Sequence, residues 1–182
     1  MYGLVNAAFR ELIVSLYGHD QWERVRLAVV PDEDTFSAME QYPDEITYQM
    51  VQRTCEITGC SSDDLLIKFG ELWVVYTDRQ GYGALFEIAG PSLPDFLMAL
   101  NDLHARVGRN FPKLRPPTFR FDVIDSVAFG SRAESRVSTL RMHYLTRRTG
   151  LCPFVRGLLQ GLSARFRTPV AVEHPVCQRL GA

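Results

Sequence analysis

Long apolar runs, a cysteine framework and an excess of one charge are all missing from this sequence of 182 residues. No apolar run approaches the ~20 residues that cross a bilayer, and the segment after Met1 lacks the basic region and cleavage site of a secretory signal. Four cysteines are too few and too scattered for a disulfide framework. We therefore expect a cytoplasmic protein of a reducing compartment, with no membrane partner.

The net charge is −1, because 20 Lys and Arg residues oppose 21 Asp and Glu residues, which argues against a nucleic-acid partner. This balance conceals an asymmetry. Residues 1–105 carry 6 basic and 17 acidic side chains, whereas residues 106–182 carry 14 basic and 4 acidic ones. Eighteen of the basic residues are arginines, which hold carboxylates or phosphates through paired hydrogen bonds. We expect each half to meet opposite charge in the other half or in a partner.

The first half of the chain has the apolar periodicity of helices. With 46% apolar and 23% charged residues, the composition is that of a folded globular protein and excludes disordered and fibrous classes. Apolar side chains recur at helical spacing in several segments. Those that we expect to be helices are 3–17, 44–58, 61–76 and 92–107.

The pattern changes in the second half, where two consecutive prolines exclude a helix. Residues 118–124 alternate apolar and polar side chains, as a half-buried strand does. A polar stretch at 125–138 links them to a second strand at 139–147, so a hairpin is expected. A helix at 153–166 and a last strand at 169–172 follow.

These elements predict an α+β fold in a single domain over residues 1–182. An N-terminal helical lobe covers about 1–65, and a second lobe with a small antiparallel sheet and helices covers about 66–182. A chain of this length can bury an ordinary core in such an arrangement.

His104 stands on the apolar face of the helix expected at 92–107. An imidazole there is either a core histidine bonded to a backbone carbonyl or a ligand of a metal or heme iron. Periodicity alone favours the core histidine.

Tyr144, Thr146 and Arg148 form a row of hydrogen-bond donors on one face of the second strand. At about 3.3 Å per residue the row is ~13 Å long, which matches a ligand with two carboxylates. The alternative is an edge strand with ordinary solvated side chains.

Cys152, His174 and Cys177 are a third set, in which two thiols and an imidazole are three of the four ligands that a tetrahedral zinc site needs. Buried or incidental thiols are the alternative, which three ligands alone favour.

Several of these residues together resemble a known family, the heme nitric oxide/oxygen-binding (H-NOX) domain, which includes the heme domain of soluble guanylate cyclase. The resemblance lies in the opening Met1-Tyr2-Gly3-Leu4-Val5-Asn6, in Leu103-His104-Ala105-Arg106-Val107, in the following Pro116-Pro117 and in Tyr144-x-Thr146-x-Arg148. It extends from Met1 to about Cys177. Thr146 replaces the serine of the family motif and keeps its hydroxyl.

The resemblance implies a b-type heme between the two lobes. One heme explains both the helical histidine and the polar row, so the resemblance favours His104 as an iron ligand over a core histidine. The implied roles are the axial ligand His104, the propionate-binding Tyr144, Thr146 and Arg148, the acidic partner Asp44 of that arginine, and the heme-distorting Pro117 and Val5.

The resemblance also bears on which gas is sensed. Family members that hold oxygen use a distal tyrosine, whose place is taken here by Pro153, while Phe9 and Trp73 replace its supports and Leu4 completes the pocket. Neither Pro153 nor Phe9 donates a hydrogen bond, and we expect Trp73 to be an apolar wall. The implied function is a sensor of nitric oxide and carbon monoxide that excludes oxygen. An oxygen-binding H-NOX domain and a heme enzyme are the alternatives.

Signalling would follow from release of His104 by nitric oxide and rotation of the lobes. The sequence shows no kinase or cyclase segment, so we expect a non-enzymatic domain that regulates a separate histidine kinase or diguanylate cyclase.

Cys152, His174 and Cys177 match three of four zinc ligands in one branch of the family. Residues 127–138, with Arg132 and Arg136, form a longer stretch than in typical members, either a loop extension or a partner contact.

Overall fold

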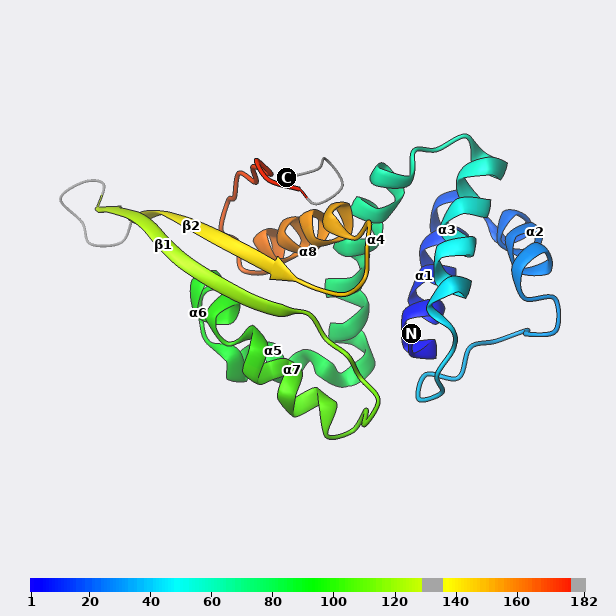
Figure 1. Ribbon diagram of the computed structural model, residues 1–182, viewed down its shortest axis with the longest axis horizontal. Helices are drawn as coiled ribbons and strands as arrows, with labels where there is room; N and C mark the ends of the chain where they lie inside the picture. The colour runs from blue at the N-terminus through cyan, green and yellow to red at the C-terminus, as the bar shows by residue number, and fades with distance from the viewer. Residues whose placement is uncertain (129–135, 178–182) are drawn as a thin grey trace.

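The computed structural model in Figure 1 describes residues 1–128 and 136–177. Helices α1, α2 and α3 group on one side, α4 and α8 lie in the centre, and α5, α6 and α7 lie on the other side with the hairpin of β1 and β2. The elements are α1 (Gly3–Tyr17), α2 (His19–Val29), α3 (Asp44–Thr58), α4 (Ser62–Thr77), the π-helical turn η1 (Asp78–Tyr82), α5 (Gly83–Ala89), α6 (Leu93–Met98), α7 (Leu100–Gly108), β1 (Thr118–Ala128), β2 (Arg136–Leu145) and α8 (Cys152–Arg165).

The N-terminal helices enclose the first hydrophobic core. Phe9 and Ile13 of α1, Trp22 of α2 and Met50 of α3 are at most 1% exposed. The expected helices at 3–17, 44–58 and 61–76 are confirmed as α1, α3 and α4. Helix α2 was not predicted. Gly18, with a φ of 87°, ends α1 as expected, but a second helix begins at the next residue without a linker between them.

Helices α4 and α8 cross in direct backbone contact at two glycines. A Cβ added to Gly157 would lie 1.9 Å from the carbonyl oxygen of Ile67, and one added to Gly70 would lie 2.2 Å from the carbonyl oxygen of Phe154. Side chains larger than hydrogen are therefore excluded at this crossing. The helix expected at 153–166 is confirmed as α8.

Helix α4 also joins the two hydrophobic cores of the molecule. Its Phe69 belongs to the first core, whereas Val74 belongs to a second core with Phe96 of α6 and Leu162 of α8. The boundary between the two lobes, expected near residue 65, lies within α4 (Ser62–Thr77). The division of the chain into these two lobes stays a prediction.

The expected helix at 92–107 is two helices in the structure. Ala99 has a φ of −84° and a ψ of −4°, which turns the chain between α6 and α7. The turn lets Phe96 and Leu97 of α6 enter the second core while α7 packs beside β1. A continuous helix would have had to place both sets of side chains along one stripe.

The expected hairpin is confirmed, with strands that differ from those predicted. Strands β1 and β2 pair antiparallel, with Phe119 opposite Tyr144 and an irregularity between Val123 and Asp125. The second strand ends at Leu145 instead of 147, and the last strand expected at 169–172 is wrong. Pro169 has no N–H for a ladder, and no described strand pairs with this segment. No helix among the described residues is long and apolar enough to cross a membrane.

Candidate functional site

His104 lies in the middle of α7 against β1. Its imidazole stacks on the ring of Phe119 with centroids 5.9 Å apart and planes at 28°. The Nδ1 atom is buried and has no hydrogen-bond partner among the described residues, so no described carbonyl satisfies it as a core histidine requires. Burial lowers the pKa of His104, which keeps the imidazole neutral at neutral pH. A neutral imidazole with an unpaired nitrogen is the form that binds a metal.

Asn101 fixes the position of Phe119, the ring on which His104 stacks. It precedes His104 by one helical turn, and its Nδ2 donates to the carbonyl oxygen of Phe119 at 2.7 Å while its Oδ1 accepts from the Phe119 N–H at 3.0 Å. The two bonds fix α7 to the start of β1. Sequence reasoning missed both residues as site residues. The signals were the spacing of three residues from His104 and the inward position of Phe119 in the alternating strand.

Tyr144, Thr146 and Arg148 share one face, at and just beyond the end of β2. All three are half-buried, whereas Leu145 and Arg147 between them are exposed. The centroid of the Tyr144 ring lies 5.6 Å from that of Phe119, so Phe119 contacts both Tyr144 and His104. Burial raises the pKa of Tyr144, although a hydrogen bond with Thr146 opposes the shift, and the phenol remains a donor at neutral pH.

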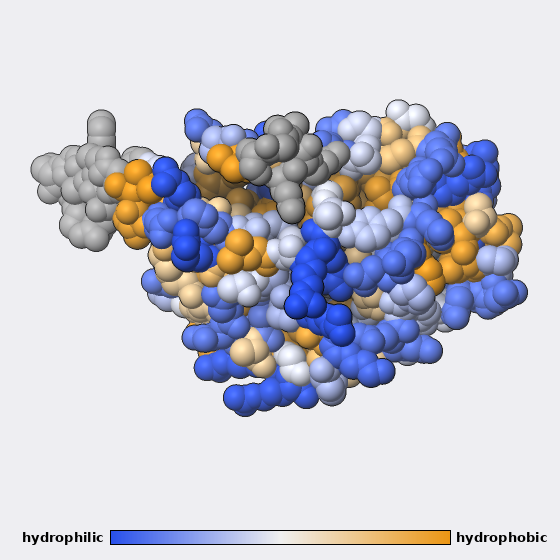
Figure 2. All heavy atoms as spheres, in the orientation of Figure 1, coloured by the Kyte–Doolittle hydropathy of each residue, from blue (hydrophilic) through white to orange (hydrophobic). Residues whose placement is uncertain are grey.

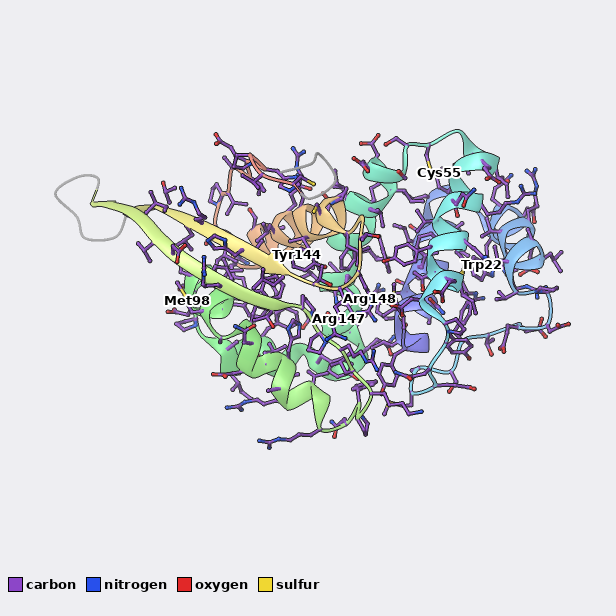
Figure 3. All side chains as sticks on the ribbon, in the orientation of Figure 1. Trp22, Cys55, Met98, Tyr144, Arg147 and Arg148 are labelled. Atoms are coloured by element: carbon purple, nitrogen blue, oxygen red, sulfur yellow. The ribbon has the colours of Figure 1, made fainter. Side chains whose placement is uncertain are left out.

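Arg148 connects this row to the N-terminal helices. Its Nε donates to Oδ2 of Asp44 at 2.7 Å, Nη2 donates to Oδ1 at 3.3 Å, and Nη1 donates to the carbonyl oxygen of Arg115 at 3.0 Å. A guanidinium has five N–H donors, so three serve described residues and two remain for a bound carboxylate. Figure 3 labels Arg148 between the end of β2 and α1, and Figure 2 shows hydrophilic surface there.

Asp44, at the start of α3, carries the charge that holds Arg148. The amino group of Met1 also donates to its Oδ1, at 2.5 Å. Burial on its own would raise the pKa of Asp44, but the hydrogen bonds from Arg148 and from the amino group outweigh it and lower the pKa. The carboxylate is therefore charged, and the pair links α3 to the segment after β2.

A group of aromatic rings lies across α1, α4 and α8. Phe69 is its centre, with ring centroids 5.3 Å from Phe9, 6.3 Å from Trp73 and 5.1 Å from Phe154. Phe9 is 0% and Phe69 is 3% exposed. Phe9 and Trp73, predicted from the resemblance, are thus brought together through Phe69. Pro153 is buried at the start of α8, but the residue of α8 that contacts Phe69 is Phe154. Periodicity predicted Phe69 and Phe154 only as core residues.

A cavity of about 330 Å³ borders these rings. Val5 lines it together with Phe69, Phe154 and Leu151, while Leu4 packs against the same core. Of the described residues, neither His104 nor the half-buried Pro117 lines this cavity. The structure therefore places Val5 on the side of the aromatic rings and Pro117 directly before β1.

Cys152, His174 and Cys177 come together although they span two segments. Their ligand atoms lie within 4.8 Å of one another, with the two Sγ atoms 3.8 Å apart. No further ligand joins them among the described residues, so a complete zinc site stays a prediction. Of the expected extension at 127–138, residues 129–135 lie outside the described ranges.

Comparison with known proteins decides the family. The family model described as Haem-NO-binding matches residues 2–174. This chain belongs to the Haem-NO-binding family. The H-NOX domains of this family are heme-binding gas-sensor domains and not catalytic ones, so the resemblance in the sequence is confirmed.

Relatives and solved structures agree with this membership. Soluble guanylate cyclase gcy-31 of Caenorhabditis elegans is 26% identical over 95% of this chain and 23% of its own length. Soluble guanylate cyclase gcy-33 of the same organism is 31% identical over 91% of this chain and 16% of its own length. The chain thus spans less than a quarter of these curated relatives.

Among solved structures, an H-NOX protein from S. oneidensis in the Fe(II)NO ligation state superposes with a TM-score of 0.82 at 16% identity, covering 100% of this chain and 94% of that one. A mutant of the S. oneidensis protein in the Fe(II) ligation state gives a TM-score of 0.87 at 16% identity, covering 100% of this chain and 91% of that one. At these identities the likeness shows the H-NOX fold, and the α+β architecture is confirmed.

Proposed function

We propose that this H-NOX domain binds nitric oxide and carbon monoxide at a ferrous b-type heme, excludes oxygen, and signals by release of its proximal histidine. The observation that carries the proposal is the buried, unpaired Nδ1 of the neutral His104 imidazole. No described carbonyl holds this imidazole as a core histidine, and a neutral imidazole is the form that ligates a heme iron. When bound, the heme provides the coordination position that the gas occupies.

The residues near His104 fit such a group. Tyr144 and Thr146 offer hydroxyls and Arg148 offers two further N–H donors for the two propionates, from one face of the chain. Asp44 orients the guanidinium by a two-point ion pair, which leaves those donors on its other edge. Pro117 and Val5 are assigned the role of pressing on the porphyrin from the resemblance alone.

Exclusion of oxygen is proposed from the apolar members of the distal group. Phe9, Phe69 and Phe154 have no hydrogen-bond donor, and neither does Pro153, while the indole N–H of Trp73 is taken, as the resemblance implies, to be part of an apolar wall. Bound oxygen is polarised and gains from a distal donor, whereas nitric oxide and carbon monoxide bind ferrous heme without one. An apolar distal wall therefore lowers the affinity for oxygen selectively.

Oxygen binding is the second candidate, and one residue favours it. Tyr76 stacks on Trp73 with centroids 6.3 Å apart and carries a hydroxyl. Burial raises its pKa, as does the charge of Glu11, while Arg79 opposes the shift. Tyr76 is 6% exposed and belongs to the first core, so its hydroxyl is the donor to test for an oxygen-binding role.

Absorption spectra of the purified, reduced protein test the proposal. We expect a Soret band, no lasting oxygen complex in air, and a clear shift of the band when nitric oxide is added. A stable oxygen complex that the Tyr76→Phe variant loses would establish the second candidate instead. Turnover of peroxide with an organic reductant at rates above those of free heme would favour the heme enzyme. A missing Soret band would contradict all of these functions, because each of them requires bound heme.

Signalling depends on how loosely α7 is held. No residue of α7 is completely buried, although Leu100 and Leu103 pack against the second core, and Asn101 joins the helix to β1 by two hydrogen bonds. Release of His104 would therefore free a helix that is packed less deeply than α1 or α4. The effector that reads this movement is proposed, from the resemblance, to be a histidine kinase or a diguanylate cyclase. Pull-down of candidate effectors with and without nitric oxide tests that step.

A further inference from the structure

Two cysteines that the heme site does not use lie side by side at the turn between α3 and α4. Cys55 is in the last turn of α3, and Cys60 follows the glycine that ends it. Their Sγ atoms are 3.4 Å apart, and both thiols are free. Figure 3 labels Cys55 beside the connection from α3 to α4.

The turn holds the pair together through its backbone. Gly59 has a φ of 74°, in the left-handed region that glycine adopts freely, and its N–H donates to the carbonyl oxygen of Cys55 at 2.8 Å. Next, the N–H of Cys60 is 3.4 Å from the hydroxyl of Thr58, which itself donates to the carbonyl oxygen of Thr54 at 2.8 Å. A disulfide needs the two sulfurs to approach from 3.4 Å to about 2.05 Å.

Small molecules can reach the pair through Cys60. Both cysteines are half-buried, and Cys60 lines a cavity of about 670 Å³ together with Tyr17, Ser61 and Lys68. The cavity lies on the surface formed by α1 and α4, apart from the aromatic rings and from His104. Oxidation at this place therefore does not need the heme site to open.

We propose that Cys55 and Cys60 are a modification site, at which a low-molecular-weight disulfide oxidises the two thiols to one disulfide across the α3–α4 turn. The proposal goes beyond the gas-sensing function and does not rest on it. In the first step, the Cys60 thiolate attacks one sulfur of the small disulfide, whose S–S bond breaks and releases one thiolate. In the second step, Cys55 loses its proton and attacks the sulfur of Cys60, and the second small thiolate leaves. Two protein thiols are oxidised and one small disulfide is reduced to two thiols.

Cys60 is the first nucleophile for two reasons. Both cysteines pack against the first hydrophobic core, but only Cys60 of the two also lines the cavity. Burial, and then the hydrogen bond to Cys60, raises the pKa of Cys55 to about 12, so Cys55 is a thiol at neutral pH and reacts only once Cys60 carries a leaving group.

The disulfide would join the end of α3 to the start of α4. Ser61 caps α4 by accepting from the N–H of Asp64 at 3.1 Å, so the crosslink ends one residue before the cap. Closing this short loop restricts the unfolded chain, and we expect the melting temperature to rise by about 2–5 °C.

The test uses the full heme-loaded chain and glutathione disulfide as the oxidant. After alkylation of free thiols, trypsin cleaves after Arg53 and after Lys68 and so releases residues 54–68 as one peptide. Both cysteines lie within this peptide. We expect this peptide to lose two hydrogens and to take no label, with a rise in melting temperature that a dithiol reductant reverses. Cys152 and Cys177 lie in other peptides, so their oxidation is counted separately.

Two variants assign the steps. Cys55→Ser is expected to stop at a stable glutathione adduct on Cys60, whereas Cys60→Ser should react with glutathione disulfide at least about tenfold more slowly. The proposal is overturned if wild-type peptide 54–68 carries two labels after oxidation, or if its end product is the glutathione adduct. It is equally overturned if the crosslink forms no faster in the native chain than in urea.

Discussion

The two sides of the candidate heme site are built differently. On the distal side, Phe9 and Phe69 are almost completely buried among rings from three helices. On the proximal side, no residue of α7 is completely buried, Leu100 and Leu103 are partly buried against the second core, and Asn101 anchors the helix to β1 through two hydrogen bonds. The difference supports the proposed roles, in which the distal side selects the gas and the proximal side moves when His104 is released.

Removal of the proximal ligand is the largest perturbation of this contrast. We expect His104→Gly to lower the affinity for heme on the order of 100-fold or more, because the iron loses its protein ligand. Added imidazole should restore the wild-type spectrum by filling the space that the side chain leaves. Heme titration followed at the Soret band measures both effects. Wild-type affinity in the variant without imidazole would mean that another residue is the ligand.

A methyl group placed in the rigid part should be the next largest effect. Gly157→Ala forces α4 and α8 apart, since the new Cβ would lie 1.9 Å from a backbone oxygen, and we expect a loss of about 3 kcal/mol in the free energy of unfolding. Gly108→Ala is the matched control at the end of α7, where no atom lies within 4 Å of the added Cβ. It should be neutral or stabilise by up to about 1 kcal/mol. Urea unfolding of both variants tests the contrast, and equal losses would contradict it.

The anchor of α7 should contribute a smaller amount. Asn101→Ala removes both hydrogen bonds to the backbone of Phe119, and we expect a loss of about 1–2 kcal/mol. Asn110→Ala, at an exposed position just after α7, should change stability by less than about 0.5 kcal/mol. If the two variants unfold alike, Asn101 is not the anchor of this side.

The smallest effect concerns the ion pair between Asp44 and Arg148, which links α3 to the segment after β2. The pKa of Asp44 is lowered in the folded protein, so as the pH falls below its ordinary 3.8 the unfolded chain takes up the proton first and stability is lost. Asp44→Asn should remove this acid-dependent loss and, because the carboxylate is 34% exposed to solvent, should weaken the protein by less than about 1 kcal/mol at neutral pH.

Thermal melts between neutral pH and pH 3 measure the effect. Glu45→Gln is the control, since it removes a neighbouring exposed carboxylate on the same helical turn. An Asp44→Asn variant that keeps the wild-type acid profile would exclude the pair as its source.

How far the sequence predicted these features depends on the range of the interactions. Helices α1, α3, α4 and α8 follow from local apolar periodicity, and the alternation of β1 placed Phe119 and Phe121 inward, whereas Val123, predicted on the same face, is 60% exposed beside the irregularity in register. The break at Ala99 and the absence of a strand at 169–172 depend on packing between distant segments, which local pattern does not contain. Likewise, His104 was visible as a polar residue on an apolar face, but only the register of Phe119 with Tyr144 shows which ring contacts both it and the polar row.

The charge asymmetry is accounted for in part by particular pairs. Asp44 with Arg148 and Asp78 with Arg165 join acidic residues of the first half to arginines of the second. Arg165 also lies 4.3 Å above the ring of Phe86. These contacts show that opposite charges of the two halves meet within the molecule.

Hydrogen–deuterium exchange of α7 in the heme-loaded protein tests the central claim most directly, namely that release of His104 frees the proximal side. We predict that nitric oxide raises exchange in α7 while α1 and α4 stay protected, that His104→Gly shows the raised exchange without nitric oxide, and that imidazole reverses it. Unchanged exchange in α7 on addition of nitric oxide, together with wild-type protection of α7 in His104→Gly, would contradict the account.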